Sequence, residues 1–195
     1  MRFVFVGLGN PGKEYELTRH NSGRIVLEQF RKKNNFSDWQ QDKKTKGLVS
    51  EGKIKKEKII LLEPEIFMNN SGKSVATVVK NGKAAERAIV IYDDLDLPLG
   101  SFKISFDRGS GGHKGLESII RAIKTRKFVR IRVGISPATP SGKAKKPDSA
   151  KINDFIVSPF KEKELEALKK LSKKTTEALE IIVSEGREKA MSIYN

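Results

Sequence analysis

The chain has 195 residues, which suits one domain with a substantial hydrophobic core. It carries 39 Lys and Arg against 24 Asp and Glu, and the net charge of +15 indicates a polyanionic partner. With no Cys and only two His, the composition excludes a disulfide framework, a cysteine nucleophile and a zinc site made of thiolates or three histidines. A heat-adapted surface is the alternative explanation of the charge, but the excess of one sign argues against it as the whole cause.

The N-terminal apolar run does not resemble a secretory signal. It breaks at Asn10-Pro11-Gly12, which is too early for the apolar region of a signal peptide. Mean hydropathy is −0.48, and no stretch approaches the roughly 20 apolar residues that a membrane-spanning helix needs. We therefore expect a cytoplasmic protein that is not bound to a membrane.

The N-terminal part of the chain predicts strands and a helix. Phe3–Val6 is an unbroken apolar run that ends at a glycine, which is typical of a strand buried on both faces of a parallel sheet. The capping residues Asn21-Ser22-Gly23 begin a helix that continues to about residue 33. A strand over 57–62 is expected to pair with 47–54 just upstream.

In the middle of the chain, predicted helices and strands continue to alternate. A helix is predicted over 71–81, closed by Gly82, and a strand over 88–92. That strand runs directly into Asp93-Asp94-Leu95-Asp96. Because open α/β sheets bind ligands at the carboxyl ends of their strands, these carboxylates mark a candidate site.

The last third contains a glycine-rich segment and a long helix. The segment 109–115 leads into a helix with apolar residues between 116 and 123, and a strand is predicted over 128–135. The stretch 137–149 is rich in Pro, Lys, Ser and Ala without an apolar period, which indicates a mobile basic loop. Leucines, isoleucines and a valine between 165 and 183 then line one side of a C-terminal helix.

Strands and helices alternating on one core favour a particular fold class. We expect an α/β protein: a single domain over residues 1–195, built as a three-layer α/β/α sandwich with a mixed, mostly parallel central sheet.

Two glycine-rich motifs resemble nucleotide-binding loops. Gly7-Leu-Gly-Asn-Pro-Gly12 matches the dinucleotide pattern, but Pro11-Gly12 makes a turn where that motif begins a helix, and Glu28 lies inside a helix. In the second, Lys114 is followed by Gly and not by Ser or Thr, as a phosphate loop requires. These departures exclude a dinucleotide-dependent oxidoreductase.

Unusual polar residues gather where strands are expected to end: Asn10, His20, Asn69, Asp93 and the turn that contains His113. Histidine is suited to proton transfer near neutral pH, and a neighbouring carboxylate fixes its tautomer and stabilises its protonated form. His20 and Asp93 are the natural pair. Taken singly, each residue is also explained as a turn residue, a helix cap or a surface histidine.

The order of these residues along the chain resembles that of a known protein family. Four motifs follow one another along the chain: Gly7-Leu-Gly-Asn-Pro-Gly12 with Tyr15 and Thr18-Arg-His-Asn21, Phe67-Met-Asn-Asn-Ser-Gly72, Asp93-Asp-Leu-Asp-Leu-Pro98, and Gly109-Ser-Gly-Gly-His113 with Gly115-Leu116. Over nearly its full length the chain resembles bacterial-type peptidyl-tRNA hydrolases.

The resemblance implies cleavage of the ester between a peptide and the terminal ribose of tRNA, without a metal or other cofactor. It implies that His20 is the general base and that Asp93 orients it. Asn10 would help to position the ester, Asn69 would hold the peptide and polarise the carbonyl, and Tyr15 would line the pocket.

One position in the substrate-binding loop departs from the family. His113 matches, but Lys114 stands where the family has an asparagine that binds the peptide backbone or the catalytic water. An ammonium only donates hydrogen bonds and carries a charge, so that role cannot transfer unchanged. Lys114 either stabilises the oxyanion or turns outward to a tRNA phosphate. Because this charge is expected close to His20, it would also lower the pKa of His20 relative to a Lys114→Asn variant.

The basic charge is expected to serve tRNA binding, since such contacts rest largely on phosphates. Lys103 and Arg132 resemble the family's clamp for the 5′ phosphate, whereas Ser105 stands where the family is often basic. Three lysines of the mobile loop could compensate: Lys143, Lys145 and Lys146. A lysine run is more often simply a solvated face.

We therefore expect a monomeric hydrolase whose partner is peptidyl-tRNA. The alternative is a catalytically impaired RNA-binding homologue of the same fold, since Lys114 could mark such a loss. The intact His20 and Asp93 pair argues against it, because a pure binder has no need of a general base. Turnover distinguishes the two.

Overall fold

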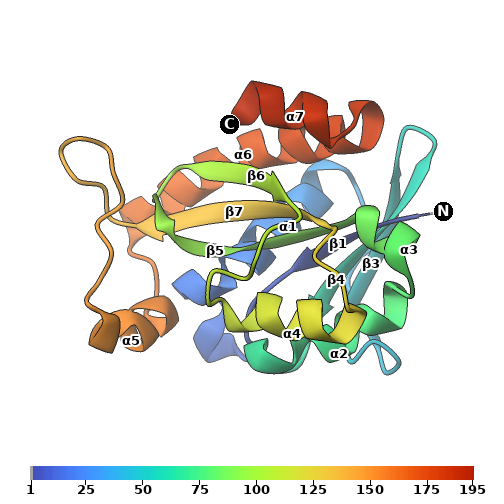
Figure 1. Cartoon of the computed structure of the whole chain (residues 1–195), viewed down its shortest axis with the longest axis horizontal. Helices are drawn as coiled ribbons and strands as arrows, with labels where there is room; N and C mark the ends of the chain where they lie inside the picture. Colours follow the sequence, from blue (N-terminus) through green and yellow to red (C-terminus); the bar gives the residue numbers. More distant parts are fainter. Residues whose placement is uncertain (1) are drawn as a thin grey trace.

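The computed structural model of the chain describes residues 2–195 and contains a seven-stranded sheet with helices on both faces (Figure 1). The strand order is β2-β3-β4-β1-β5-β7-β6. The strands are β1 (Phe3–Gly7), β2 (Gln40–Asp42), β3 (Gly47–Ile54), β4 (Glu57–Pro64), β5 (Ala88–Pro98), β6 (Phe102–Phe106) and β7 (Val129–Ser136). The central strands β4, β1, β5 and β7 are parallel, and β2, β3 and β6 join antiparallel. The expected fold class is confirmed.

Seven α-helices flank the sheet: α1 (Ser22–Lys33), α2 (Ser71–Val78), α3 (Gly82–Glu86), α4 (Lys114–Ile123), α5 (Ile152–Val157), α6 (Glu162–Glu185) and α7 (Arg187–Tyr194). In Figure 1, α2 and α4 lie below the sheet, and α6 and α7 lie above it. None of these helices is both long and apolar enough to cross a membrane.

Alternate side chains of the central strands pack into two separate cores. In β1, Phe3 and Phe5 face the core shared with α1, α6 and α7, while Val4 and Val6 face the core shared with α2 and α4. Both faces of β1 are therefore buried, which explains the unbroken apolar run that predicts this strand.

The expected helix over 71–81 is shorter in the structure. It ends at Val78, because Val79 adopts an extended conformation with φ −106° and ψ 92°. Gly82 does not close this helix but begins α3. The side chain of Asn81 caps α3 by accepting a hydrogen bond of 2.9 Å from the backbone N–H of Ala84.

The strand expected over 88–92 continues to Pro98, so the acidic motif lies within β5 and not after it. Its pairing with β7 persists through Asp94 and, after an irregularity, resumes at Pro98. The sequence analysis missed β6, which is only five residues long, although Phe102, Ile104 and Phe106 alternate with polar residues along it.

The C-terminal helix expected from the apolar period is confirmed as α6, and Gly186 ends it. The structure adds α5 and α7, which the sequence analysis did not predict. The stretch 137–149 has no helix or strand before Ser149, where a 3-10 turn begins, but an isolated bridge joins Ala138 and Ala144. The mobility of this loop stays a prediction.

Candidate active site

His20 and Asp93 meet at the carboxyl edge of the parallel strands. Nδ1 of His20 lies 2.8 Å from Oδ1 and 3.0 Å from Oδ2 of Asp93, and both side chains are buried. Asp93 comes from β5, and His20 from a single 3-10 turn just before α1. With Nδ1 engaged by the carboxylate, Nε2 is the atom of His20 that can accept a proton.

Arg19 fixes the turn that carries His20. Its buried guanidinium donates two hydrogen bonds of 2.8 Å to the carboxylate of Glu164 on α6, and others to the backbone oxygens of Ser158 and Pro159. This arrangement ties His20 to the segment before α6. A residue next to the base thereby contributes rigidity without contacting the reacting atoms.

Gly23 lets the start of α1 approach β5. A Cβ built on Gly23 would lie 2.2 Å from the backbone oxygen of Ile91 and 2.6 Å from the backbone nitrogen of Leu8. Only glycine fits at this distance. The close approach brings the turn before α1 next to Asp93.

His113 also binds Asp93, a contact that sequence reasoning missed. Nε2 of His113 lies 3.0 Å from Oδ1 of Asp93. The other ring nitrogen, Nδ1, accepts a hydrogen bond of 3.3 Å from the backbone N–H of Leu116 in the first turn of α4. In the neutral ring the proton is therefore on Nε2, which donates it to Asp93. The carboxylate thus holds two histidines.

Among the described residues, the one group with metal-ligand spacing is His20, Asp93 and His113, whose ligand atoms lie within 4.8 Å of one another. A metal on Nε2 of His113 would move the ring proton to Nδ1. That proton would face the N–H of Leu116. The tautomer set by the start of α4 thus disfavours a metal at this site, and the three groups form a hydrogen-bonded set.

The pKa values of the pair move apart. Burial disfavours the charged form of His20, but the charge of Asp93 and its hydrogen bond outweigh burial and raise the pKa of His20 above 6.5. Burial also disfavours the Asp93 carboxylate, yet His20 and His113 outweigh it and lower the pKa of Asp93 far below its usual value. Asp93 is therefore charged, and its charge favours the protonated form of His20.

Asn10 lies just after the end of β1, and both its side chain and its backbone are held by hydrogen bonds. Its side-chain oxygen accepts a hydrogen bond of 2.9 Å from the backbone N–H of Met68, and its backbone exchanges two hydrogen bonds with the side chain of Asn21. Because Oδ1 of Asn10 is occupied, Nδ2 is the group that can donate to a substrate. Asn21, whose side chain positions Asn10, was not among the predicted site residues.

Asn69 and Tyr15 are less enclosed. Asn69 is exposed in the 3-10 turn before α2, and its side-chain oxygen accepts a hydrogen bond of 3.1 Å from Asn70. Tyr15 is half-buried in the turn between β1 and His20. Their roles toward a substrate stay predictions.

The side chain of Lys114 is 70 % exposed, and its Nζ lies 3.3 Å from Oε2 of Glu117, one turn along α4. The groups that set the pKa of His20 are its burial and Asp93. Lys114 lines the same cavity as His20, but its exposed ammonium is paired with Glu117 and is not among the groups that shift the pKa of His20. We therefore expect a Lys114→Asn substitution to leave the pKa of His20 nearly unchanged.

A cavity of about 820 Å³ joins the His20–Asp93 pair to the phosphate clamp expected from the sequence. Lys103 and Arg132 lie opposite each other on β6 and β7 and both line this cavity. Arg132 donates a hydrogen bond of 2.7 Å to Asp94, and Lys146 of the basic loop forms an ion pair with Asp96. Lys146 and Ser105 both line the cavity, whereas Lys143 and Lys145 do not, and compensation by Lys146 stays a prediction.

Arg130 supports the glycine-rich loop, a role that the sequence analysis did not assign. It is 1 % exposed, and its guanidinium donates to the backbone oxygens of Arg108 and Gly109. The signal in the sequence is an arginine between the apolar residues Val129 and Ile131 of a buried strand, because such a charge needs buried partners. These hydrogen bonds hold the start of the loop that leads to His113.

The fold and the site together define a class: a three-layer α/β protein with a buried histidine–aspartate pair, suited to general-base chemistry, at the carboxyl edge of its sheet. The family model for peptidyl-tRNA hydrolase matches residues 4–195. The chain belongs to the peptidyl-tRNA hydrolase family.

Known peptidyl-tRNA hydrolases are similar in sequence to this chain over nearly its full length. The peptidyl-tRNA hydrolase of Pseudothermotoga lettingae is 39 % identical, with 98 % of this chain and 96 % of the relative covered. That of Thermoanaerobacter sp. (strain X514) is 41 % identical over 99 % of each. The crystal structure of peptidyl-tRNA hydrolase from Acinetobacter baumannii superimposes with a TM-score of 0.88 at 28 % identity, covering 100 % of this chain and 94 % of that one.

Proposed function

We propose that this chain hydrolyses the ester between the peptide and the 3′-terminal ribose of peptidyl-tRNA, with His20 as general base. The observation that carries the proposal is the buried pair in which Asp93 engages Nδ1 of His20 at 2.8 Å and leaves Nε2 for the water. The family that the chain belongs to supports the substrate.

In this mechanism a water oxygen attacks the ester carbonyl carbon while Nε2 of His20 takes the water's proton. The imidazolium that forms is stabilised by Asp93, whose charge is already secured by His113. When the bond to the ribose oxygen breaks, His20 returns the proton to that oxygen. The products are the free peptide and a tRNA with an intact terminal ribose.

Asn10 and Asn69 would bind the substrate around this base. The Nδ2 group of Asn10 is the donor left by its hydrogen bond with Met68, and it would position the ester. Asn69 would hold the peptide and polarise the carbonyl, which its exposed position permits. His113 would line the same pocket while it holds Asp93.

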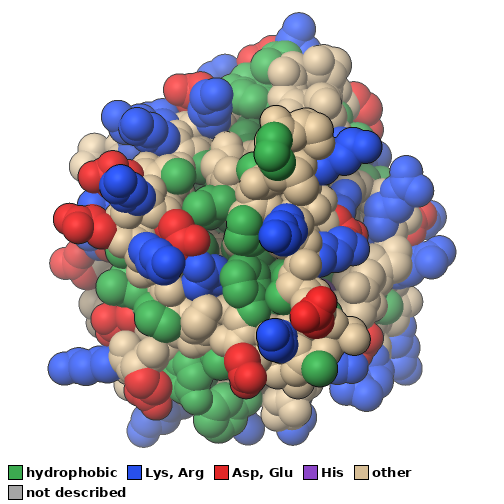
Figure 2. All heavy atoms as spheres, turned by 90° about the vertical axis from the view of Figure 1, so that its left-hand side faces the viewer, with side chains coloured by type: hydrophobic (Ala, Val, Ile, Leu, Met, Phe, Trp, Pro, Cys, Tyr) green, Lys and Arg blue, Asp and Glu red, His purple; other side chains and the backbone are tan. Residues whose placement is uncertain are grey.

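The tRNA would be held through its phosphates. Figure 2 views the molecule from the side where β5 and β7 end, and Lys and Arg side chains surround a strip of hydrophobic side chains there. Lys103 and Arg132 would bind the terminal 5′ phosphate, and that phosphate would compete with Asp94 for Arg132. We further propose that Lys114, turned outward, contacts another phosphate. A cytoplasmic location and a monomeric state stay predictions.

The test is release of an N-blocked aminoacyl group from tRNA by the purified protein in the presence of EDTA. We expect turnover by the unmodified protein and a loss of about 10²- to 10⁴-fold in His20→Ala, the range for removal of a general base. Lys114→Asn is expected to retain turnover, with a changed KM for tRNA. Binding of tRNA without turnover by the unmodified protein would instead support the RNA-binding alternative.

A further inference from the structure

A second cavity, of about 650 Å³, lies between α1 and α6, and it shares no lining residue with the active-site cavity. We call it the α1–α6 groove. Its lining residues are Gln29, Lys32, Lys33, Glu166, Lys169, Lys170, Ser172, Lys173 and Thr176. Five of these nine are lysines and one is an acid, so the groove carries a strong positive charge. The lysines come from both walls.

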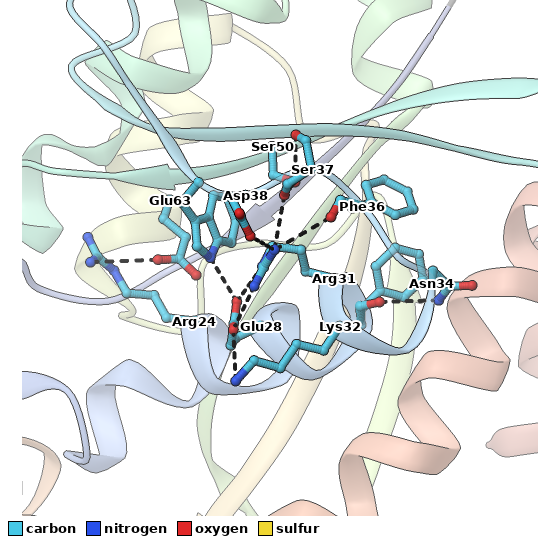
Figure 3. A network of polar contacts seen from close by, with 12 residues as sticks. Arg24, Glu28, Arg31, Lys32, Asn34, Phe36, Ser37, Asp38, Ser50 and Glu63 are labelled. Atoms are coloured by element: carbon cyan, nitrogen blue, oxygen red, sulfur yellow. Dashed lines mark hydrogen bonds and ion pairs between the residues drawn. The ribbon is translucent and has the colours of Figure 1, made fainter.

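The lysines of the two walls differ in their partners. On α1, Lys32 forms an ion pair with Glu28 (Figure 3), with a separation of 3.1 Å, and Lys33 lies 3.4 Å from Glu180. On α6, none of the three groove lysines forms an ion pair with any residue from 2 to 195; these are Lys169, Lys170 and Lys173. All three are exposed. The α6 wall is therefore the free cationic part of the groove.

This clustering opposes helix stability. Lys169 and Lys173 are four residues apart, and so are Lys170 and Lys174, which places like charges next to each other on α6. Such pairs destabilise a helix by a few tenths of a kcal/mol each, and Glu166 and Glu177, three or four residues from these lysines, offset part of that cost. A bound polyanion would relieve the repulsion, whereas water only screens it.

The lining of the groove indicates which polyanion fits. No hydrophobic or aromatic side chain lines it, although protein interfaces and membrane-binding helices depend on such anchors. Contacts to a nucleic-acid backbone need only cations and small polar groups. Charge and lining therefore both favour a ribose-phosphate backbone over an acidic protein.

The groove lysines do not line the active-site cavity, and those on α1 are remote from the reacting atoms. The turn with His20 immediately precedes α1, whereas Lys32 and Lys33 lie at the far end of this helix. At about 1.5 Å per residue the helix separates them by roughly 16 Å. A contact here would therefore act on binding and not on the chemical step.

We propose that the α1–α6 groove is a second RNA-binding surface, which holds the phosphate backbone of a tRNA away from its 3′ end. The proposal rests on the proposed function, because that function makes tRNA the substrate. It adds a binding surface on the face of the sheet that α1 and α6 cover.

The experiment compares two triple variants that each remove three positive charges. The groove variant is Lys169→Gln with Lys170→Gln and Lys173→Gln, and glutamine preserves helix propensity. The matched control is Lys53→Gln with Lys56→Gln and Lys58→Gln, three exposed lysines on the β3–β4 hairpin that form no ion pair within residues 2–195. Thermal melting verifies that both variants are folded.

Binding of deacylated tRNA is measured as a function of salt for all three proteins. We expect the slope of log K against log salt to become shallower by about 2 to 3 in the groove variant, since each lost phosphate contact removes about 0.9. At low salt its Kd should rise about tenfold or more, while the control stays near the unmodified protein. Equal changes in the two variants, or none in the groove variant, would overturn the proposal.

A second substrate separates this proposal from the proposed function. An N-blocked aminoacyl ester of a short 3′-terminal oligonucleotide fills the active site but cannot reach the groove, so the groove variant should turn it over at the unmodified rate. A groove variant slow on this ester would contradict a purely binding role. If the unmodified protein cleaves neither ester but its tRNA affinity depends on the groove, the proposed function fails and the groove assignment stands.

Discussion

Asp93 receives hydrogen bonds from two histidines, and their tautomers determine what the site can do. His113 is fixed with its proton on Nε2 by the N–H of Leu116, so it serves only as a donor to the carboxylate. His20 donates from Nδ1 and keeps Nε2 for chemistry. One carboxylate thus fixes two rings, but only one of them becomes the base.

Replacing Asp93 tests this arrangement through the pH profile. The base acts when neutral, and the raised pKa of His20 places the acidic limb of kcat/KM above pH 6.5. In Asp93→Asn the raising causes are removed while burial remains, so the limb should move below 6.5. The rate at the plateau should fall by about 10²-fold or more, because the imidazolium loses its counter-charge.

NMR titration of the His20 ring in both proteins measures the same pKa directly. An acidic limb that stays in place when Asp93 is replaced would show that another group controls the base.

At the scale of the elements, close packing of α1 on the sheet positions the site. The helix begins where Gly23 contacts the backbone of β5, and Arg19 ties the preceding turn to α6. The sequence predicted the elements that show a strong apolar period or a buried run, such as β1, β4 and α6. It missed β6 and α7, because segments of five and eight residues are too short for their apolar pattern to stand out from the rest of the chain.

Gly23→Ala is expected to destabilise the fold strongly. The new methyl group would overlap the backbone oxygen of Ile91, which cannot move without shifting β5. The expected loss is about 2 kcal/mol or more in the free energy of unfolding, with lower activity because His20 moves. Chemical denaturation measures it.

Gly82→Ala is the matched control, because a Cβ there meets nothing within 4 Å and the residue is helical. It should be neutral or stabilise by up to about 1 kcal/mol. Similar losses in both variants would contradict the role of the close approach.

At the scale of the whole molecule, the charged residues divide into an exposed set at the surface and a small set buried between the layers. Most lysines are exposed, whereas a few ionisable groups are buried. Glu63 on β4 is one of these: it is 7 % exposed, and its nearest cation, Nη1 of Arg24, lies 3.9 Å away (Figure 3). Arg24 is mainly engaged with Glu65, at 2.7 Å. Burial raises the pKa of Glu63 to about 8, although Arg24 opposes the shift.

Glu63 should make stability fall with rising pH. The folded protein keeps the Glu63 proton up to about pH 8, whereas the unfolded chain releases it near pH 4.5, so the stabilisation present below 4.5 is lost across that window. Glu63→Gln removes this loss. At pH 8 its free energy of unfolding should exceed that of the unmodified protein by on the order of a few kcal/mol.

Urea denaturation of both proteins between pH 5 and 8 measures the difference. Other groups, including His20, contribute equally to both curves. Parallel curves would show that Glu63 is ionised in the folded protein.

The sequence by itself determined the strand–helix alternation, the family, and the His20–Asp93 pair, because motif order and apolar runs are local properties of the chain. It could not determine the direction of Lys114, which depends on Glu117 one helical turn away.

Only the tertiary structure decided the roles of His113 and Arg130. The first depends on which ring nitrogen meets the start of α4, and the second on a loop that folds back over β7. The α1–α6 groove likewise exists only because two helices more than a hundred residues apart in the chain pack side by side. Hydrogen bonds and grooves of this kind form between residues that are far apart in the chain. Local sequence patterns do not show which of those residues meet in space.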